Sequence, residues 1–296
     1  MASPIDPFNL DNADAYRRWR DTKLHQHPGR ADELVVEVAD PRNLTAAERE
    51  AIASRLQRAN MAIYVSPLRD ADKELPRSIA RQFGLRSLDG NWLADEDGIS
   101  SLTVSEGGDR VDFIPYTNRA IRWHTDGYYN PPRRRIHAMV LHCVQDAASG
   151  GDNALLDHEI AYLLLCDQDP AYIAALMAPD AMTIPARSDA EGVSRPAETG
   201  PVFHVDPLSG RLHMRYTART RSIEWKQDAP TLAAVAALER ILAGASPFIF
   251  RTRLTPGAGL ICSNVLHDRS AFVDDPERPR LLYRARYHDA IDRTGG

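Results

Sequence analysis

The segment from residue 99 to residue 157 most strongly restricts the folds open to this chain. It consists of short apolar stretches separated by turns, at residues 99–104, 109–116, 121–126, 136–144 and 153–157. Similar stretches return near the C-terminus, at residues 247–254, 259–265 and 280–290. Repeated short strands of this kind are typical of an antiparallel β-sandwich or a jelly-roll barrel. We therefore predict a sheet-rich core in the second part of the chain.

The beginning of the chain has a different pattern, in which strands and helices alternate. Residues 33–38 (ELVVEV) and 61–65 (MAIYV) are predicted to be strands. Between them, Thr45 is followed three residues later by Glu48, which is the signature of a capping box at the start of a helix. A second helix is expected at residues 71–83. The sequence therefore predicts a β-α-β-α unit ahead of the core.

Two further helices interrupt the strand-rich part, at residues 157–177 and 231–244. The residues between them show no clear period beyond two short strands. We therefore predict an α+β fold in one domain, with a jelly-roll core and flanking helices. The predicted limits are 1–296 for the domain, 1–100 for the N-terminal α/β part, 100–290 for the core and about 157–245 for a long insert within it.

Composition narrows the class of protein. The chain has 296 residues, 43% of them hydrophobic and 26% charged, and a net charge of −5, so nothing favours binding to nucleic acid or to an anionic membrane. No apolar run approaches the roughly 20 residues that span a bilayer, and the N-terminus lacks a signal-peptide core. The three cysteines form no C-x-x-C pair. We expect a cytoplasmic protein with a small-molecule partner, and the sequence leaves homo-oligomer formation open.

His124 and Asp126 stand two residues apart at the end of an apolar stretch (IRWHTD). In a strand, residues at this spacing point to the same face, so an imidazole and a carboxylate could hold one metal ion. The alternative is an ordinary turn, because Gly127 and the residues 130–132 (NPP) also favour one. A metal site would need a third ligand from elsewhere in the chain.

His267 follows another buried strand and is the candidate third ligand, although a polar residue at a strand end is the simpler explanation. Arg280 follows thirteen residues later, and in a strand it would share one face with Arg284 and Arg286. Three arginines on one face are costly unless they are solvated or paired with anions. They form either a solvated outer face or a clamp for carboxylates, which the guanidinium fork matches well.

Taken in chain order, four segments resemble the Fe(II)- and 2-oxoglutarate-dependent dioxygenases of the taurine dioxygenase superfamily. They are YTNRAIRWHTD, VLHCVQDAASGGDNALLD, NVLHDRSAF and RPRLLYR, and the similarity extends over roughly residues 40–290. The resemblance is closest to the γ-butyrobetaine and trimethyllysine hydroxylase branch. It implies a double-stranded β-helix (jelly-roll) core. It also implies that His124, Asp126 and His267 hold the catalytic Fe(II), with 2-oxoglutarate and O2 completing the site.

The resemblance also assigns the 2-oxoglutarate site. Arg280 matches the residue that pairs with the distal carboxylate, and Arg284 matches a second arginine that supports the C1 end. Asn153 stands where relatives often have a Thr or Ser that touches the distal carboxylate, and an Asn side chain can donate the same hydrogen bond.

The substrate is less well defined. Tyr116, eight residues before His124, matches one position of the aromatic cage that binds a trimethylammonium group, but Arg286 replaces a late aromatic residue. A fixed positive charge suits an anionic molecule better than a quaternary amine. We therefore expect both residues to line the mouth of the site, and γ-butyrobetaine and trimethyllysine to be poor substrates. Alternatively, Arg286 pairs with a nearby acid such as Asp289.

The predicted activity is hydroxylation of a small anionic molecule, with release of succinate and CO2. The same iron and oxygen chemistry could instead give oxidative cleavage, desaturation or epimerisation. A non-catalytic metal- or 2-oxoglutarate-binding sensor is the alternative from another class of protein. Release of succinate would distinguish an enzyme from a sensor.

Overall fold

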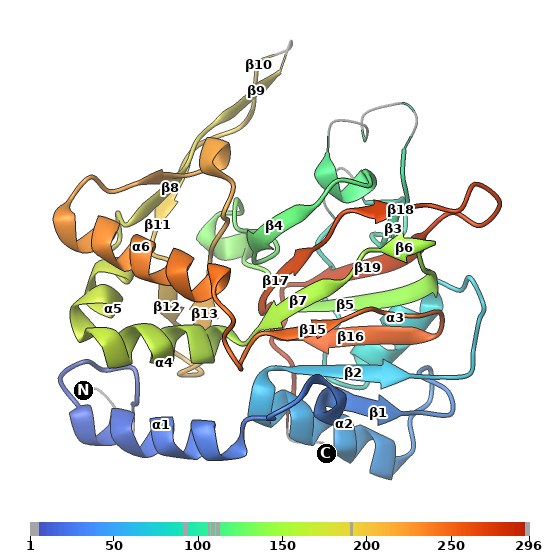
Figure 1. Ribbon diagram of the computed structural model, residues 1–296, viewed down its shortest axis with the longest axis horizontal. Helices are drawn as coiled ribbons and strands as arrows, with labels where there is room; N and C mark the ends of the chain where they lie inside the picture. The colour runs from blue at the N-terminus through green and yellow to red at the C-terminus, as the bar shows by residue number, and fades with distance from the viewer. Residues whose placement is uncertain are drawn as a thin grey trace.

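Two facing sheets form the centre of the molecule, seen on the right of Figure 1. The computed structural model describes residues 6–90, 94–105, 107, 110, 113–189 and 192–293. The larger sheet has six strands in the order β1 (Val35–Glu37), β2 (Met61–Val65), β16 (Ala258–Cys262), β5 (Ala138–Gln145), β19 (Leu281–Tyr287) and β3 (Ser100–Leu102). The smaller sheet has the order β15 (Phe250–Thr252), β7 (Asn153–Leu156), β17 (Leu266–Arg269) and β4 (Ile121–His124).

The two sheets enclose an apolar layer. Met139, Leu141 and Leu282 of the larger sheet belong to the same buried cluster as Leu155 and Phe250 of the smaller one. Alternation along β-strands explains this, because every second residue of each strand points inward. Apart from β1 and β2, which run parallel, the pairs within both sheets are antiparallel. The arrangement is consistent with the jelly-roll core that the strand pattern predicted.

Helices α2 (Ala46–Ala59) and α3 (Glu74–Arg81) cover the outer face of the larger sheet. The capping box predicted for α2 is present, since the Thr45 side chain accepts from the Glu48 amide and the Glu48 carboxylate accepts from the Thr45 amide. The predicted β-α-β-α unit is therefore confirmed as β1-α2-β2-α3. It is preceded by helix α1 (Ala13–Gln26), and β1 and β2 extend the larger sheet at one edge.

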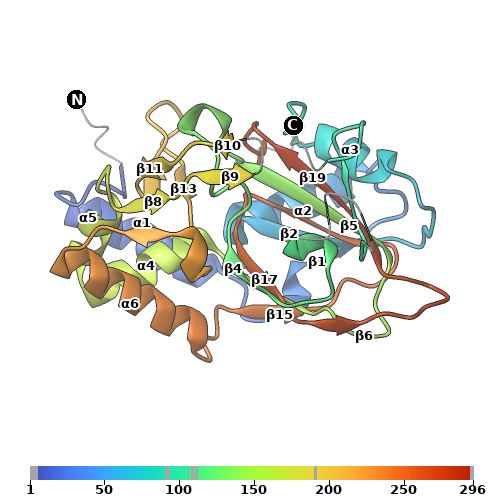
Figure 2. The same cartoon turned by 90° about the horizontal axis from the view of Figure 1, so that it is seen from above.

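The predicted insert forms a helical region beside the sheets, on the left of Figures 1 and 2. The helix expected at 157–177 is two helices, because Asp169 caps a new helix that begins at Pro170, where the backbone N–H needed to continue the first one is missing. The helices are α4 (His158–Gln168), α5 (Pro170–Leu176) and α6 (Ala229–Ala243).

Short strands that the sequence did not predict complete this region. They are β8 (Met182–Ile184), β11 (Glu198–Gly200) and β14 (Glu224–Trp225) in one sheet, and the hairpin β9 (Arg187–Asp189) with β10 (Gly192–Arg195). The two strands that were predicted form the hairpin β12 (Phe203–Val205) and β13 (Leu212–Met214). Outside this region, beside the core sheets on the right of Figure 1, β6 (Ser149–Gly150) pairs with β18 (Phe272–Val273).

One predicted strand is wrong in part. Residues 109–116 were expected to be a strand, but Ile114–Tyr116 form a 3-10 helix with Pro115 inside it, where its fixed φ suits the turn. Residues 109, 111 and 112 lie outside the described part of the chain. Within that part, no helix is both long and apolar enough to cross a bilayer.

Candidate active site

His124 and His267 are cross-strand neighbours in the smaller sheet. Strand β17 pairs antiparallel with β4, and the pairing places His267 directly opposite His124. Directly opposed residues of such a pair project from the same face, and here the ring centroids are 4.2 Å apart. The register of two strands thus brings together two histidines that are distant in sequence.

Both imidazoles are held in the orientation that a metal ligand requires. The His124 Nδ1 lies 2.9 Å from the Arg122 carbonyl oxygen, and the His267 Nδ1 lies 2.9 Å from the Val265 carbonyl oxygen. A carbonyl can only accept, so each Nδ1 carries the proton and each Nε2 keeps its lone pair. Such hydrogen bonds fix the tautomer and ring direction of metal-binding histidines.

Asp126 completes the group. Its Oδ1 lies 3.5 Å from the His124 Nε2 and 4.0 Å from the His267 Nε2. The candidate ligand atoms of the three residues all lie within 4.8 Å of one another. The Asp126 Oδ2 is buried and accepts no hydrogen bond from the residues that the structure describes, although Arg284 forms an ion pair with it. Two neutral imidazoles and one carboxylate form the donor set typical of non-heme Fe(II) oxygenases, so these residues fit that ion.

The electrostatics keep Asp126 and His267 in ligand-competent states. Burial raises the pKa of Asp126, but the positive charges of Arg284 and Arg286 lower it by more, so the pKa lies well below its usual range. Arg284 Nη1 is 3.3 Å from the Asp126 Oδ2. Burial, reinforced by His124, lowers the pKa of His267 to about 4. At neutral pH the carboxylate is therefore charged and His267 is neutral, as a metal site needs.

Asn264 holds the backbone of the proposed carboxylate ligand and was missed by the sequence analysis. Its Oδ1 accepts from the Asp126 amide at 2.8 Å, and its Nδ2 donates to the carbonyl oxygens of Asp126 at 2.9 Å and of Ile136 at 2.7 Å. Asn264 is 2% exposed and has a left-handed backbone with φ of 50°, which Asn tolerates better than most residues. The side chain thus ties the Asp126 loop to the strand that leads to His267.

We expect Asn264→Ala to weaken divalent-metal binding by roughly 10- to 100-fold, which is the usual effect of losing a partner that orients a ligand. Titration of the metal-free protein with Co(II), followed by its visible absorption, measures the affinity without turnover. Asn43→Ala, at an exposed turn, is the matched control. A folded Asn264→Ala protein with unchanged Co(II) affinity would contradict this role.

Arg280 lies just before β19 and is a buried cation that forms no ion pair with the described residues. It is 5% exposed, and its guanidinium sits over the Phe272 ring at 5.0 Å. Among the described residues, no carboxylate forms an ion pair with it and its side chain donates no hydrogen bond, since only its backbone amide is engaged, by Asp274. Burial lowers its pKa, as expected for a charge without a partner. The group is therefore ready to receive an anionic ligand.

The alternation predicted for the last strand is confirmed. Leu282 packs between the two sheets and Arg284 faces Asp126, whereas Tyr283 and Ala285 pack on the outer face. Asn153, on β7, donates from its Nδ2 to the Asp268 carbonyl at 2.9 Å, and its buried Oδ1 has no hydrogen-bond partner among the residues that the structure describes. In this orientation the amide donor expected to reach a carboxylate is engaged elsewhere.

The two residues expected at the mouth of the site are both buried. Tyr116 is 1% exposed and belongs to the apolar layer between the sheets, with the Arg110 guanidinium 4.9 Å from its ring centroid. Arg286 is 4% exposed, pairs with the buried carboxylate of Asp89 and donates to the Tyr129 hydroxyl at 3.1 Å. Its charge also acts on Asp126, and its contact with substrate stays a prediction. An acid partner had been the alternative, but Asp289 instead accepts from backbone amides of the segment before Asp89.

Comparison with known proteins supports these observations. Residues 20–286 match the family described as "Taurine catabolism dioxygenase TauD, TfdA family". A uridine-5'-phosphate dioxygenase from Streptomyces sp is 32% identical over 209 residues, which cover 66% of this chain and 71% of that protein. This relative supports the superfamily but not the γ-butyrobetaine and trimethyllysine hydroxylase branch.

Solved structures share the fold at low sequence identity. An asparagine oxygenase in complex with Fe(II), 2S,3S-3-hydroxyasparagine and succinate has a TM-score of 0.59 and 15% identity, covering 94% of this chain and 85% of that one. AAD-2 in complex with Mn(II) and N-oxalylglycine has a TM-score of 0.60 and 16% identity, covering 87% of this chain and 97% of that one. The chain belongs to the TauD/TfdA family and is an Fe(II)- and 2-oxoglutarate-dependent dioxygenase.

Proposed function

We propose that this dioxygenase hydroxylates a small anionic molecule on a double-stranded β-helix core, with conversion of 2-oxoglutarate to succinate and CO2. His124, Asp126 and His267 would hold the Fe(II), which supplies O2 activation when bound. The observation that carries the proposal is the convergence of these three side chains beside an arginine-bearing strand, next to a buried arginine that forms no ion pair with the described residues.

Arg280 and Arg284 would bind opposite ends of 2-oxoglutarate. Arg280 would pair with the distal carboxylate of 2-oxoglutarate through its guanidinium fork, because no acid among the described residues forms an ion pair with it. Arg284 lies against Asp126 and would support the C1 carboxylate close to the metal ligands. Its Nε is buried and has no hydrogen-bond partner in the described part of the chain, so it could donate to a bound anion. Asn153 is a weaker candidate, because its donor is occupied by the Asp268 carbonyl.

The first substrate class to test is a nucleoside 5'-phosphate. Uridine-5'-phosphate is named as the substrate of the Streptomyces relative, and it joins a planar base to an anionic group. This agrees with the anionic substrate expected from the sequence. The carnitine-type substrates remain poor candidates, because the cage position Tyr116 is packed in the core and its ring already carries the Arg110 guanidinium.

The decisive assay incubates the Fe(II)-loaded protein with 2-oxoglutarate, O2 and uridine-5'-phosphate, and measures succinate together with the mass of the product. Hydroxylation adds one oxygen atom, desaturation removes two hydrogens, and cleavage gives two fragments, so the alternatives are separated in one experiment. Parallel reactions with γ-butyrobetaine and trimethyllysine are the controls. Efficient hydroxylation of γ-butyrobetaine or trimethyllysine would refute the proposal that the substrate is an anionic molecule. Binding of 2-oxoglutarate without succinate under all conditions would favour a sensor.

A further inference from the structure

A cavity of about 440 Å³ lies on the outer face of the larger sheet, between helix α3 and the end of β19. Its lining consists of Arg77, Arg81, Leu85, Arg86, Leu88 and Tyr287. We call it the arginine pocket. Tyr287 packs in the outer cluster with α3, whereas its neighbour Arg286 points to the inner face of the strand. The arginine pocket and the candidate iron site therefore lie on opposite sides of β19.

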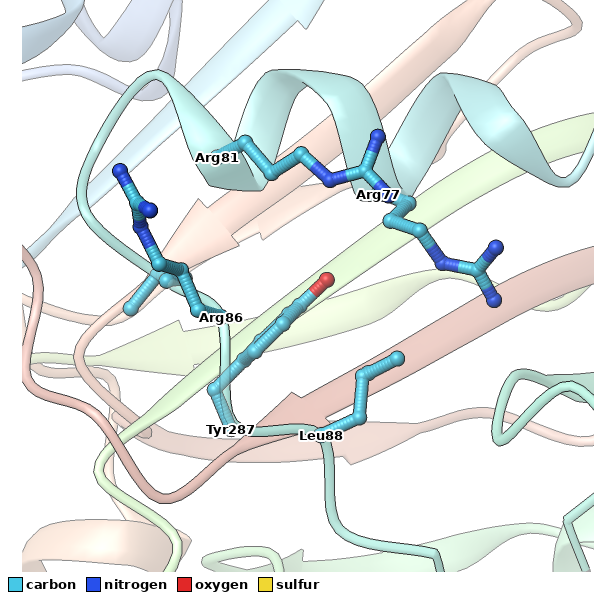
Figure 3. A pocket seen from close by; sticks show the side chains of 6 residues that line it. Arg77, Arg81, Arg86, Leu88 and Tyr287 are labelled. Carbon is cyan, nitrogen blue, oxygen red and sulfur yellow. The ribbon is translucent and has the colours of Figure 1, made fainter.

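The floor of the arginine pocket contains an unused polar atom. Figure 3 shows the Tyr287 ring below α3, with its hydroxyl directed toward the helix that carries Arg77 and Arg81. Tyr287 is 1% exposed, and within the described part of the chain its hydroxyl has no hydrogen-bond partner. A buried hydroxyl without a partner costs free energy, so an atom at this position points to a ligand or an ordered water.

The walls of the arginine pocket carry excess positive charge. Arg77 and Arg81 are four residues apart on α3 and so share one face, and both donate to the single carboxylate of Glu74. Arg77 also donates to the Asp97 carbonyl at 2.8 Å. The Arg86 guanidinium has no hydrogen-bond or ion-pair partner among the described residues. Three guanidinium groups thus line the arginine pocket, and two of them share the Glu74 carboxylate.

A second carboxylate, that of Asp289, also acts on Tyr287, which leaves three guanidinium groups against two carboxylates. Asp289 accepts from the backbone amides of Arg86 and Ser87 and from the Ser87 hydroxyl, so its oxygens are engaged by the loop itself. The same loop is fixed to β19, because Leu88 forms a bridge with Tyr287. The leucines and the tyrosine ring provide an apolar floor beneath the cationic rim. This combination suits a ligand with a planar or apolar body and one anionic group.

We propose that the arginine pocket binds an organic anion, namely a phosphate or carboxylate attached to a planar or apolar body, at a site separate from the iron site. The volume falls within the range of small-molecule pockets, which is about 300–1,000 Å³. The anionic group would lie against the guanidinium groups of Arg81 and Arg86 and accept from the Tyr287 hydroxyl. The body would cover the leucines.

The test uses calorimetric titration of the whole protein with phenyl phosphate, benzoate and inorganic phosphate. Phenyl phosphate and benzoate compare the affinity for a phosphate with that for a carboxylate on the same ring. Inorganic phosphate measures the affinity for an anionic group that carries no ring. We expect one saturable site per chain, with phenyl phosphate or benzoate binding at least about tenfold more tightly than inorganic phosphate. Arg81→Gln should weaken that binding by about tenfold or more, and Tyr287→Phe by about threefold to tenfold.

The matched control is Arg240→Gln, because Arg240 is an exposed arginine in the last turn of α6, as Arg81 is in the last turn of α3. It should leave binding unchanged, and thermal melting checks that each variant is folded. A weaker affinity in Arg284→Gln would indicate that the probe binds at the iron site and not in the arginine pocket. The proposal is overturned if none of the three probes saturates below about 10 mM. It is equally overturned if Arg284→Gln weakens binding while Arg81→Gln does not.

Discussion

Replacement of His267 by alanine is expected to abolish turnover and to weaken Fe(II) binding by more than about a hundredfold. The loss of a direct ligand should exceed the roughly 10- to 100-fold effect of losing an outer partner. Asp126→Asn keeps the shape of the side chain but removes the charge, and it should also abolish turnover. Equilibrium dialysis measures bound metal, and succinate release measures activity.

The control for these variants is His25→Ala, which removes an exposed histidine from α1. It should retain both the metal and the activity of the unmodified protein. Full turnover by His267→Ala, or turnover that persists in excess chelator, would exclude the assignment of these residues as iron ligands.

Replacement of Arg280 by alanine is expected to raise the 2-oxoglutarate requirement by roughly 30- to several-thousand-fold. A desolvated carboxylate that loses its hydrogen-bonded cation typically forfeits about 2–5 kcal/mol of binding free energy. The metal affinity should change little, because Arg280 has no ion pair with Asp126. Titration of the metal-loaded protein with 2-oxoglutarate separates the two effects.

Arg278→Gln provides a close control. Arg278 lies two residues from Arg280, but its side chain is 73% exposed and pairs with Asp275. Its replacement should leave 2-oxoglutarate binding unchanged. If Arg280→Ala and Arg278→Gln had the same affinity for 2-oxoglutarate, the buried guanidinium would have no role in binding the co-substrate.

The elements that the sequence predicted well are those with local signals. The capping box of Thr45 and Glu48 involves residues three apart, so it was visible in the sequence and is present in the structure. The cluster of His124, Asp126 and His267 was also predicted, because i, i+2 spacing on a strand and a family resemblance both pointed to it. A short spacing carried the information for the capping box and for the His124 and Asp126 pair, whereas the resemblance supplied the distant His267.

The residues that the sequence missed act through contacts without a sequence period. Asn264 forms hydrogen bonds with the backbone amide and carbonyl of Asp126, which every amino acid possesses. The residue type at position 126 therefore gives no sign of this contact. Arg286 pairs with Asp89, which lies 197 positions away, whereas the acid nearest in sequence, Asp289, is bound to a loop. Neither composition nor alternation distinguishes such partners, because only the packed structure brings them together.

The pairing of β4 with β17 also has a consequence for local stability. Strand β4 lies at the edge of its sheet, and beyond β17 it is joined only by an isolated bridge from His124 to Thr217 within the described residues. Edge strands are among the elements that open locally without global unfolding. An ion shared by His124 and His267 would cross-link this strand to its neighbour. Loss of iron would therefore loosen one corner of the protein as well as stop its chemistry, and amide exchange along β4 would rise as metal is withdrawn.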